Sequence, residues 1–510
     1  MDAALTGGEG AMTLSWWLPV LILSSSLVPG IVIFFLPEER SGLRTGLNTA
    51  GAGLKLVLVG ILVWGVFHEE TFRTELPLLP GMDLVLHADA LSVLFTVLSS
   101  VLWFLTTLYA VAYLERSPQP RSRFFGFFSL CVSATIGISM AGNLITFLVF
   151  YEALTLSTYP LVTYRGTVES MRAGAVYLAY TLTGGVVLMV GVAWLAALAG
   201  SVEFIEGGAL GELSRTVPTQ LRVIFVLLMV GLGVKAALVP LHGWLPAAMV
   251  APAPVSALLH AVAVVKAGAF GIVRVIYDVY GIVPARELGV LEPVAWVAAA
   301  TVVYGSLRAL SQDELKKRLA YSTVSQVSYI ALGCALGGPA ATLGGVAHLV
   351  HQGIMKITLF FCAGNVAETL GLHYVSQMKG VGKRMPLTMA AFTLGALGMI
   401  GVPPLAGFVS KWYLATGCLD MGQGWVILVL AASSALNAAY FLPVLHAAWF
   451  EEPEEPWTAP HGIGLTEAHW MLLLPPLVTA GLGLAAGLLA GAPFSPLGWA
   501  GLIVFREYRQ

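Results

Sequence analysis

Charged side chains are scarce in this sequence, and their scarcity excludes an ordinary soluble protein. Lys, Arg, Asp and Glu make up 11% of the 510 residues, whereas hydrophobic residues make up 57%. Soluble domains carry roughly 25% charged residues. Apolar runs of about 18 residues or more recur from end to end, and each can cross a hydrocarbon core about 30 Å thick. The composition therefore predicts an all-α polytopic membrane protein.

Cysteines and cofactor motifs are also sparse. The four cysteines form no CxxC pair, so neither a disulfide framework nor a metal cluster is predicted. No haem, flavin, iron–sulfur or nucleotide motif is present, so we expect no cofactor, and the net charge of −2 gives no indication of a nucleic-acid partner. The N-terminus lacks a basic segment and carries Glu9. Its first apolar run, 16–36, is therefore predicted to be a retained helix and not a signal peptide.

The apolar runs predict about 14 transmembrane helices. They fall at about 16–36, 46–67, 90–113, 124–140, 143–164, 174–199, 221–240, 254–277, 290–310, 319–336, 341–363, 386–414, 425–450 and 470–490. Residues 1–123 are expected to form a three-helix region, and residues 451–510 an acidic loop followed by the last helix. Between them lie two blocks of five predicted helices, 124–277 and 290–450.

The distribution of Lys and Arg predicts the orientation of the chain. With the N-terminus outside, 14 of these residues fall in inner loops and 7 on the outer side. Because inner loops of membrane proteins carry the excess of positive charge, both termini are expected on the outer, periplasmic side of the inner cell membrane.

Five lysines lie inside predicted helices, although a lysine at the centre of a membrane helix costs about 2.5–3.5 kcal/mol. They are Lys55, Lys235, Lys266, Lys356 and Lys411. Lys55 lies near a predicted helix end, from which its side chain is expected to reach the membrane surface. The other four are expected to face protein or water, and they are candidate functional residues.

Glu152 is the one acidic residue near the middle of a predicted helix, and it is the natural counter-charge for Lys235. An ion pair favours both charged forms, while burial favours both neutral forms. Moving the two groups apart would therefore encourage the lysine to release a proton, as a proton pump requires. A static salt bridge that joins two helices is the alternative interpretation.

Histidines accompany two of the lysines. His260 precedes Lys266 in one predicted helix, and His348 and His351 precede Lys356 in another, loosely on one side. Because histidine titrates near physiological pH, such a row can relay protons through water. His348 and His351 have a spacing that could form half a metal site, but no carboxylate or cysteine accompanies them, so no metal is predicted.

Prolines interrupt two of the predicted helices close to a lysine. Pro240 follows Lys235 in "VKAALVPLHGWLP", and Pro403 and Pro404 precede Lys411 in "GVPPLAGFVSK". Broken helices at membrane depth are tolerated where they line a wet cavity, and they often mark an ion path. Each broken helix is the fourth of its five-helix block. Because five is an odd number, the second block would begin on the opposite side of the membrane, and two inverted repeats are predicted.

The segment "VKAALVPLHGWLPAAMVAPAPVSALLHAVAVVKAGAFGIVR" (234–274) resembles the signature of the antiporter-like proton-translocating subunits. That family includes the L, M and N subunits of respiratory complex I, the A and D subunits of Mrp-type Na⁺/H⁺ antiporters, and relatives in membrane-bound hydrogenases. The resemblance covers roughly 85–450 and extends to "FYEALTLSTYPLV", "SQDELKKRLAYSTVSQVSYI" and "HLVHQGIMKITLFFCAGNV". It implies a proton-translocating subunit that assembles with other membrane subunits.

The resemblance also assigns roles to residues of this chain. Those that match the family's proton path are Glu152, Lys235, His260, Lys266, His348, Lys356 and Lys411. Lys411 corresponds to the exit residue, where the M subunit of complex I typically has a glutamate. The C-terminus is also too short for the long lateral helix of the L subunit. The D subunit of an Mrp antiporter, or a similar hydrogenase subunit, therefore fits best.

The sequence is also compatible with other functions. The chain could be a proton-pumping subunit of a complex I or hydrogenase-type oxidoreductase. A redox subunit that binds quinone itself would need electrons from elsewhere, because no cofactor motif is present. An independent solute transporter would need polar groups beyond the lysine–histidine row. The transported ion is expected to be H⁺, with Na⁺ as a further candidate.

Overall fold

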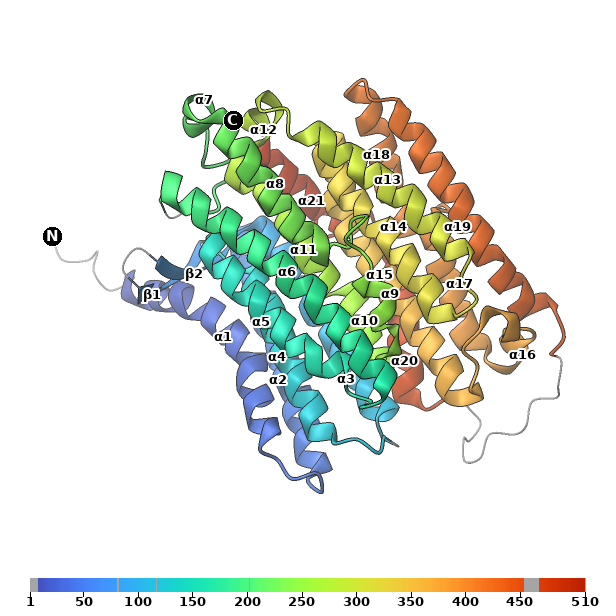
Figure 1. Ribbon diagram of the computed structural model, residues 1–510. Coiled ribbons are helices and arrows are strands. Elements are labelled where there is room, and N and C mark those ends of the chain that lie inside the picture. The colour runs from blue at the N-terminus through green and yellow to red at the C-terminus, as the bar shows by residue number, and fades with distance from the viewer. Residues whose placement is uncertain (1–7, 80–81, 116, 201, 454–466, 510) are drawn as a thin grey trace.

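The computed structural model describes residues 8–79, 82–115, 117–200, 202–453 and 467–509, with side chains from residue 14 onward. Helices dominate these ranges (Figure 1). Twelve of the helical segments in the described ranges are long and apolar enough to cross a membrane, which confirms the predicted polytopic all-α class. The predicted total of about 14 stays a prediction.

The N-terminal part contains three long helices and a hairpin. Its elements are α1 (Gly8–Phe34), α2 (Ser41–Phe67), β1 (Phe72–Leu79), β2 (Met82–Ala88) and α3 (Ala90–Tyr113). The strands β1 and β2 pair in antiparallel register. This hairpin was not predicted from the sequence, because only apolar runs of membrane-spanning length were assigned there.

The middle of the chain begins with three long helices and continues through shorter ones. Its elements are α4 (Arg121–Ser139), α5 (Leu144–Val162), α6 (Val168–Ala199), α7 (Leu213–Thr216), α8 (Pro218–Lys235), α9 (Trp244–Ala247), α10 (Ala253–Ala261), α11 (Val264–Arg274) and α12 (Ile282–Glu287). Side-chain caps start two of the long helices. Asn143 accepts a hydrogen bond from the Thr146 amide of α5, and Thr167 accepts one from the Ser170 amide of α6.

The last part of the chain also contains both long and short helices. Its elements are α13 (Leu291–Leu310), α14 (Leu315–Ala335), α15 (Pro339–Leu370), α16 (Val381–Arg384), α17 (Pro386–Ile400), α18 (Ala406–Asp420), α19 (Trp425–Phe450), α20 (Trp470–Leu488) and α21 (Pro496–Glu507). The predicted span 386–414 is thus two helices, α17 and α18.

The helices differ sharply in how much of their surface the protein covers. The most apolar windows of α15 and of the segment Ala253–Tyr280, which contains α10 and α11, are completely buried, whereas less than half of the corresponding windows of α1, α2, α6 and α19 is buried. Figure 1 shows α10 and α15 inside the bundle, with α6 and α19 toward its outside. Polar side chains on α10, α11 and α15 therefore face protein and not lipid.

Contacts between loops define the two ends of the bundle. At the hairpin side, β2 bridges to Ala141, and Asn143 bridges to Glu203. Hydrogen bonds and the charge of Arg73 hold the pKa of Glu203 below its ordinary value, although burial opposes the shift. A buried guanidinium, Arg274 of α11, binds the Asp89 carboxylate at the start of α3 with contacts of 2.5 and 2.9 Å. These bonds fix α3 against α11.

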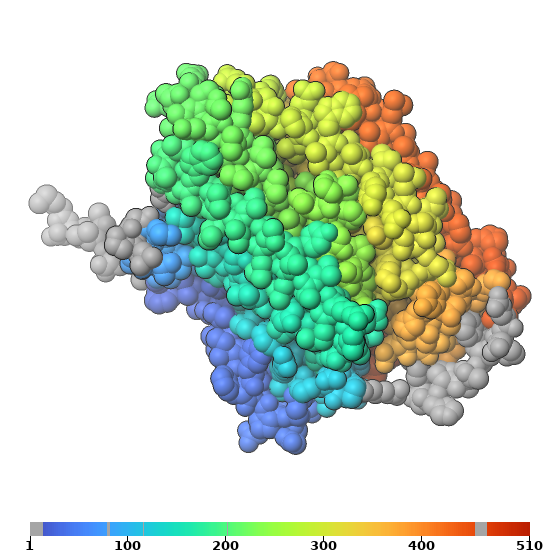
Figure 2. All heavy atoms as spheres, in the orientation of Figure 1, coloured from blue at the N-terminus to red at the C-terminus, as the bar shows by residue number. Residues whose placement is uncertain are grey.

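At the opposite side, Glu38 accepts hydrogen bonds from the amides of Arg121 and Ser122 at the start of α4. Burial alone would raise the pKa of Glu38, but these bonds and the charge of Arg44 lower it. Figure 2 shows that α1 and α2, coloured blue, protrude at this lower edge of the molecule. We call this the Arg44 side.

Candidate functional site

The first broken helix ends at Lys235, the last residue of α8. Ala237 adopts a positive φ of 56°, the Val239–Pro240 bond is cis, and helical structure resumes at Trp244. Trp244 donates from its indole nitrogen to the Val234 carbonyl at 2.7 Å, so the segment folds back onto the end of α8. The predicted interruption at Pro240 is confirmed.

Lys235 is fully buried and points toward α5. Its ammonium donates to the backbone carbonyl of Tyr151 and lies 3.3 Å from the centre of the Tyr151 ring. Gly268 of α11 packs against the backbone just after Lys235, where an added Cβ would clash with the Ala236 amide. The lysine is therefore held between three helices.

Glu152 neighbours this lysine without touching it. The two charges interact electrostatically, but the described residues include no direct ion pair between them. The Glu152 carboxylate turns instead toward Gly185 of α6, where an added Cβ would clash with its Oε1. Glu152 is only partly buried, and its Oε1 has no hydrogen-bond partner among the described residues. A salt bridge at contact distance, one of our two interpretations, is thus absent.

A third interruption divides the predicted span 254–277, which was expected to be one continuous helix. The chain leaves helical geometry between α10 and α11 at Val262 and Ala263. His260 precedes this break and stacks on Phe360 of α15 at 4.5 Å. Lys266 follows the break, is fully buried, and its ammonium has no hydrogen-bond partner within the described part of the chain.

Helix α15 carries the next three candidates, all fully buried. His348 is hydrogen-bonded through Nδ1 to the Ser410 hydroxyl of α18 at 2.7 Å. Lys356 donates to the Ser322 hydroxyl and to the Leu319 carbonyl of α14. Both histidines of this helix, His348 and His351, interact electrostatically with Lys266, as does Lys356. The structure therefore brings Lys266 together with the polar groups of α15.

The second predicted broken helix is also confirmed. Helix α17 ends at Ile400, Gly401 adopts a φ of +95°, and α18 begins at Ala406. Lys411 of α18 reaches back to this end, and its ammonium donates to the carbonyls of Met399 and Ile400 at 3.0 and 2.9 Å. It also donates to Ser434 at 3.1 Å. A cation at a helix C-terminus is favoured by the helix dipole.

Helix α14 contributes polar residues that were not singled out from the sequence. Ser322, Gln326 and Tyr329 follow spacings of four and three residues, which place them on one face. Ser322 binds Lys356, and the Tyr329 ring lies 5.1 Å from the His348 ring and 5.5 Å from the Lys411 ammonium. Hydroxyl residues recur at helical spacing in this helix, and that pattern was the available signal.

Many buried polar atoms of this region have no protein partner. Among the described residues these atoms belong to Lys266, His260, His348, His351, Gln326, Gln352 and Tyr329. An unsatisfied buried polar group costs roughly 1–3 kcal/mol. Internal water typically supplies the partners of such groups. The row from Lys266 to Lys411 is therefore suited to holding water among titratable side chains.

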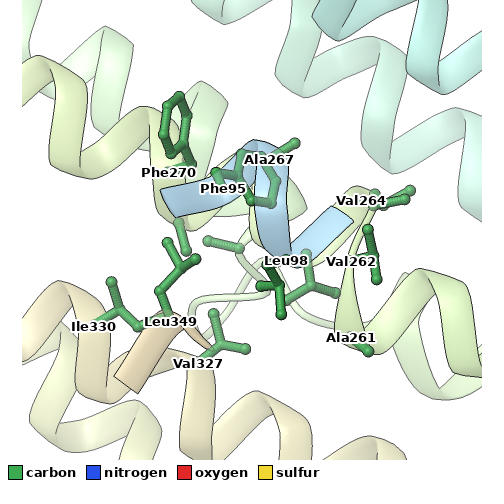
Figure 3. Close-up of a cluster of buried hydrophobic side chains, with 14 of the residues drawn as sticks. Phe95, Leu98, Ala261, Val262, Val264, Ala267, Phe270, Val327, Ile330 and Leu349 are labelled. Atoms are coloured by element: carbon green, nitrogen blue, oxygen red, sulfur yellow. The ribbon is translucent and has the colours of Figure 1, made fainter. Parts of the chain in front are cut away.

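Apolar side chains surround the break between α10 and α11. Figure 3 shows Phe95 and Leu98 of α3 meeting Val262, Val264 and other residues on both sides of the break. Phe95 stacks on Phe270 with ring centres 4.8 Å apart. The cluster also contains Val327 and Ile330 of α14 and Leu349 of α15, so apolar side chains of these helices pack together beside the break.

The position of Lys55 corrects one expectation. We expected its side chain to reach the membrane surface, but Lys55 is completely buried in the middle of α2. Its ammonium donates to the Ser26 hydroxyl of α1 at 2.6 Å. Lys55 lies near the middle of both the predicted span 46–67 and α2, so the expectation misjudged its depth, and α1, α3 and α4 pack around it.

Comparisons with known proteins agree with this fold. The family described as NADH:quinone oxidoreductase/Mrp antiporter, TM matches residues 141–437. The chain is 37% identical over 382 residues to NADH-quinone oxidoreductase subunit N of Desulforudis audaxviator, covering 74% of each chain. It is 29% identical over 451 residues to the Na(+)/H(+) antiporter D subunit of Bacillus subtilis, covering 86% of this chain and 88% of that one.

The same likeness extends to a solved structure. A chain in the structure of the Mrp complex from Dietzia sp. DQ12-45-1b superposes with a TM-score of 0.86 at 25% identity, and 98% of each chain is covered. The family match contains all eight candidate residues, from Glu152 to Lys411. The protein therefore belongs to the NADH:quinone oxidoreductase/Mrp antiporter transmembrane family.

Proposed function

We propose that this chain is a proton-translocating subunit of a multisubunit membrane complex. Protons would move along the row formed by Glu152, Lys235, Lys266, the α15 histidines with Lys356, and Lys411. The observation that carries this proposal is the row of buried amines and imidazoles, in which the Lys266 ammonium and ring nitrogens of His260, His348 and His351 have no hydrogen-bond partner among the described residues. Ionisable groups inside membrane proteins commonly mark such paths.

The geometry around Lys235 supports a switch at the start of the row. Glu152 is close enough to influence the lysine electrostatically, yet it is not bonded to it. A carboxylate that approaches the ammonium would favour the charged lysine, and one that withdraws toward Gly185 would favour proton release. Lys235 would then pass its proton toward Lys266, which lies on the helix packed against the same break.

The two interrupted blocks, 124–277 and 290–450, are proposed to be inverted repeats. Their packing supports this proposal, because α6 packs against α8 in the first block and α15 packs against α18 in the second. In each block the fourth helix is broken beside a lysine. Each repeat would supply half of the path, and the two halves would meet between Lys266 and α15.

The orientation is also a proposal. The Arg44 side carries the loops that are rich in Lys and Arg, which supports its placement on the inner face, with both termini outside in the inner cell membrane. Reporter fusions at the C-terminus test this placement. A fusion that is active only on the inner side would contradict it.

Proton movement tests the main proposal. Membrane vesicles that contain the assembled complex should show no proton translocation when Lys235→Ala or Glu152→Ala is introduced, while the complex still assembles. Lys383→Ala is the matched control, because this lysine is exposed and bound only to an exposed glutamate in the described structure. Wild-type translocation by either of the first two variants would refute the assigned roles.

A second candidate function is proton pumping that electron transfer drives. The relative from Desulforudis audaxviator, named as a subunit of an NADH-quinone oxidoreductase, supports it. The relative from Bacillus subtilis, named as a Na(+)/H(+) antiporter subunit, supports exchange driven by an ion gradient, with Na⁺ as the second ion. Proton movement that requires added electron donor and acceptor would favour the first, and Na⁺-dependent proton movement without them would favour the second. Solute uptake by the purified chain alone would contradict both.

A further inference from the structure

Lys55 is a fully buried amine outside the proposed proton path. It lies in the middle of α2, where α1, α3 and α4 pack around it. No charged group of the described residues interacts electrostatically with it. A buried lysine without a counter-charge is costly in a membrane protein, and such residues are functional candidates.

A chain of hydrogen bonds leads away from this amine. The Lys55 ammonium donates to Ser26 at 2.6 Å, and the hydroxyls of Ser26 and Ser133 are 2.8 Å apart. Ser133 donates to the Ser129 carbonyl at 2.9 Å, and the Ser129 hydroxyl donates to the Asn48 amide oxygen at 2.9 Å. These bonds join α2 to α1, α1 to α4, and α4 back to α2.

The same face of α2 continues toward the Arg44 side. Arg44, Asn48 and Lys55 are all buried, and their spacings of four and seven residues place them on one face. Eleven residues of helix separate Arg44 from Lys55, a rise of roughly 16 Å. Arg44 binds Glu38 at 3.2 Å, and Glu38 is 41% exposed. Arg44, Asn48 and Lys55 therefore form a polar stripe on α2 that begins at the molecular surface and ends at the buried amine. We call it the lysine stripe.

Polar atoms along this stripe lack protein partners. Within the described residues, Asn48 Nδ2, Arg44 Nε and the indole nitrogen of Trp103 are buried and unpaired. Trp103 of α3 lies directly over the lysine, with its ring centre 4.7 Å from the ammonium. Buried polar groups without protein partners are commonly hydrogen-bonded to internal water, and these three N–H groups are such donors.

The lysine stripe is separate from the row of residues in the proposed proton path. Phe95 and Leu98 of α3 belong to the apolar cluster that faces α10, α11 and α15 (Figure 3). An added Cβ at Gly353 of α15 would meet Leu98 at 3.2 Å, so α3 packs directly on α15 through apolar contacts. Helix α3 thus presents Trp103 to the lysine stripe and its apolar side chains to the row.

We propose that Lys55 is a second proton-binding site, reached from the Arg44 side through water held between α2, α3 and α4. The hydroxyl of Ser26, which is itself hydrogen-bonded to Ser133, would accept a hydrogen bond from the ammonium while it is charged. The proton arrives from water and returns to water, so no other reactant is needed. This inference rests on the proposed function, because it adds a branch to the same translocation.

A purely structural role is the competing explanation. The Lys55–Ser26 bond would then join α1 to α2, as the close approach of Gly51 to the Ser25 carbonyl already does without a charge. An apolar side chain would join the helices at lower cost than a buried ammonium. The surface connection through Arg44 and Glu38 is also unnecessary for such a role, whereas a proton site requires it.

The first experiment measures proton translocation by the assembled complex in membrane vesicles. Lys55→Met keeps the chain length and removes the titratable group, and we expect at least a threefold loss of rate. Lys55→Arg should lose as much, because guanidinium does not release its proton. An arginine variant at the wild-type rate, or an unimpaired methionine variant, would overturn the proposal.

Two serines on α1 provide a matched pair for the same assay. Ser26→Ala should lower the rate and shift its pH profile, because it removes the hydroxyl that binds Lys55. Ser25→Ala is the control, since the Ser25 hydroxyl binds only the Ile22 carbonyl of its own helix in the described structure. Equal effects of the two substitutions would contradict the assigned role of Ser26.

The second experiment tests water access without relying on turnover. In a complex whose four native cysteines are replaced by alanine, Asn48→Cys should react with a small water-soluble thiol reagent at least tenfold faster than Leu62→Cys. Both positions are fully buried on α2, but Leu62 is surrounded by apolar residues. Equally slow reaction at both positions would overturn the proposed water path.

A parallel Lys235→Ala sample separates this inference from the proposed function. If Lys235→Ala is inactive while Lys55→Met is unimpaired, the second site is refuted and the proposed function stands. If Lys235→Ala translocates normally, the proposed function fails, and thiol labelling at position 48 still reports whether the stripe is hydrated.

Discussion

Lys235 and Lys411 both lie beside a broken helix, but their surroundings differ. Within the described residues, Lys235 has one hydrogen-bond acceptor, the Tyr151 carbonyl, together with an aromatic face and a carboxylate out of contact. Lys411 has three acceptors, two of them the last carbonyls of α17. The Lys411 ammonium is therefore solvated by three protein groups, whereas Lys235 has one acceptor and a nearby carboxylate that does not contact it.

This difference indicates that the two breaks have different tasks. Three fixed acceptors hold an ammonium in place whatever the rest of the protein does. With a single acceptor and a carboxylate out of contact, we expect the charge of Lys235 to respond to small displacements of α5 or α6. In the proposed proton path, the first break would therefore control proton release and the second would hold a proton.

Arginine substitutions at the two lysines should give the largest contrast. Lys235→Arg is expected to abolish proton translocation, below about a hundredth of the wild-type rate, because guanidinium stays protonated. Lys411→Arg can still donate to the Met399 and Ile400 carbonyls, so we expect it to retain about a tenth of the rate or more. Vesicle assays of the assembled complex measure both. Equal loss in the two variants would remove the distinction between the breaks.

Glycines beside the charged groups offer a subtler test. Gly185→Ala would place a Cβ against Glu152 Oε1, so the carboxylate must move, and we expect translocation to fall about tenfold. Gly401→Ala would meet the Lys411 chain at 2.9 Å in a positive-φ position, which strains the backbone and should lower stability by about 1–2 kcal/mol. Gly53→Ala is the control, since nothing lies within 4 Å of its Cβ. Vesicle assays and thermal unfolding measure the two effects, and a Gly185 variant as active as the control would contradict a mobile carboxylate.

The hydrogen bond between α15 and α18 should have a smaller effect. Ser410→Ala removes the hydroxyl that binds His348 at 2.7 Å, and the loss of one such bond costs about 1 kcal/mol. We expect Ser410→Ala to lower the rate of proton translocation several-fold. The rates of the Lys235 variants should keep the same order. Thr416→Ala is the control, because its hydroxyl binds only its own helix in the described structure. A Ser410 variant as active as this control would show that His348 needs no partner.

The ion pair at the hairpin side should matter least. Arg73 binds Glu203 at 2.8 Å and lowers the pKa of this carboxyl, so the contribution to stability is present above the ordinary pKa of 4.5 and is lost as the pH falls through the lowered value. Glu203→Gln should therefore reduce stability by less than about 1 kcal/mol at neutral pH, and by less still in acid. Thermal unfolding at several pH values measures this, and translocation should not change.

Much of the fold could be predicted from the apolar runs, because lipid requires long helices with internally paired backbones. The interruptions at Pro240 and at Pro403 were visible for the same reason, since proline removes a backbone donor. The break at Val262 and Ala263 carries no proline or glycine, so only tertiary packing reveals it. The β1–β2 hairpin was missed because its strands are too short to register as membrane spans.

The candidate site was predictable where a charge stands in an apolar run. That signal found Glu152 and the four central lysines, but it gave no distances, and the two interpretations of the Glu152–Lys235 pair could be compared only in the structure. Lys55 was misjudged because it was assigned to a helix end, although it lies near the middle of both the predicted span 46–67 and α2, and the sequence does not show that α1 covers its ammonium.

The acceptor of Lys235 is a main-chain atom, and this has a consequence for how the protein can change over generations. Every amino acid carries a carbonyl, so no point substitution at position 151 deletes the oxygen that Lys235 binds. A substitution at position 151 can replace the aromatic ring, but the hydrogen bond from Lys235 to the carbonyl persists as long as α5 keeps its position. Conservation of this bond therefore depends on the residues that position α5, whereas the identity of residue 151 matters for the ring contact with Lys235 and for the hydroxyl bond to the Gly231 carbonyl.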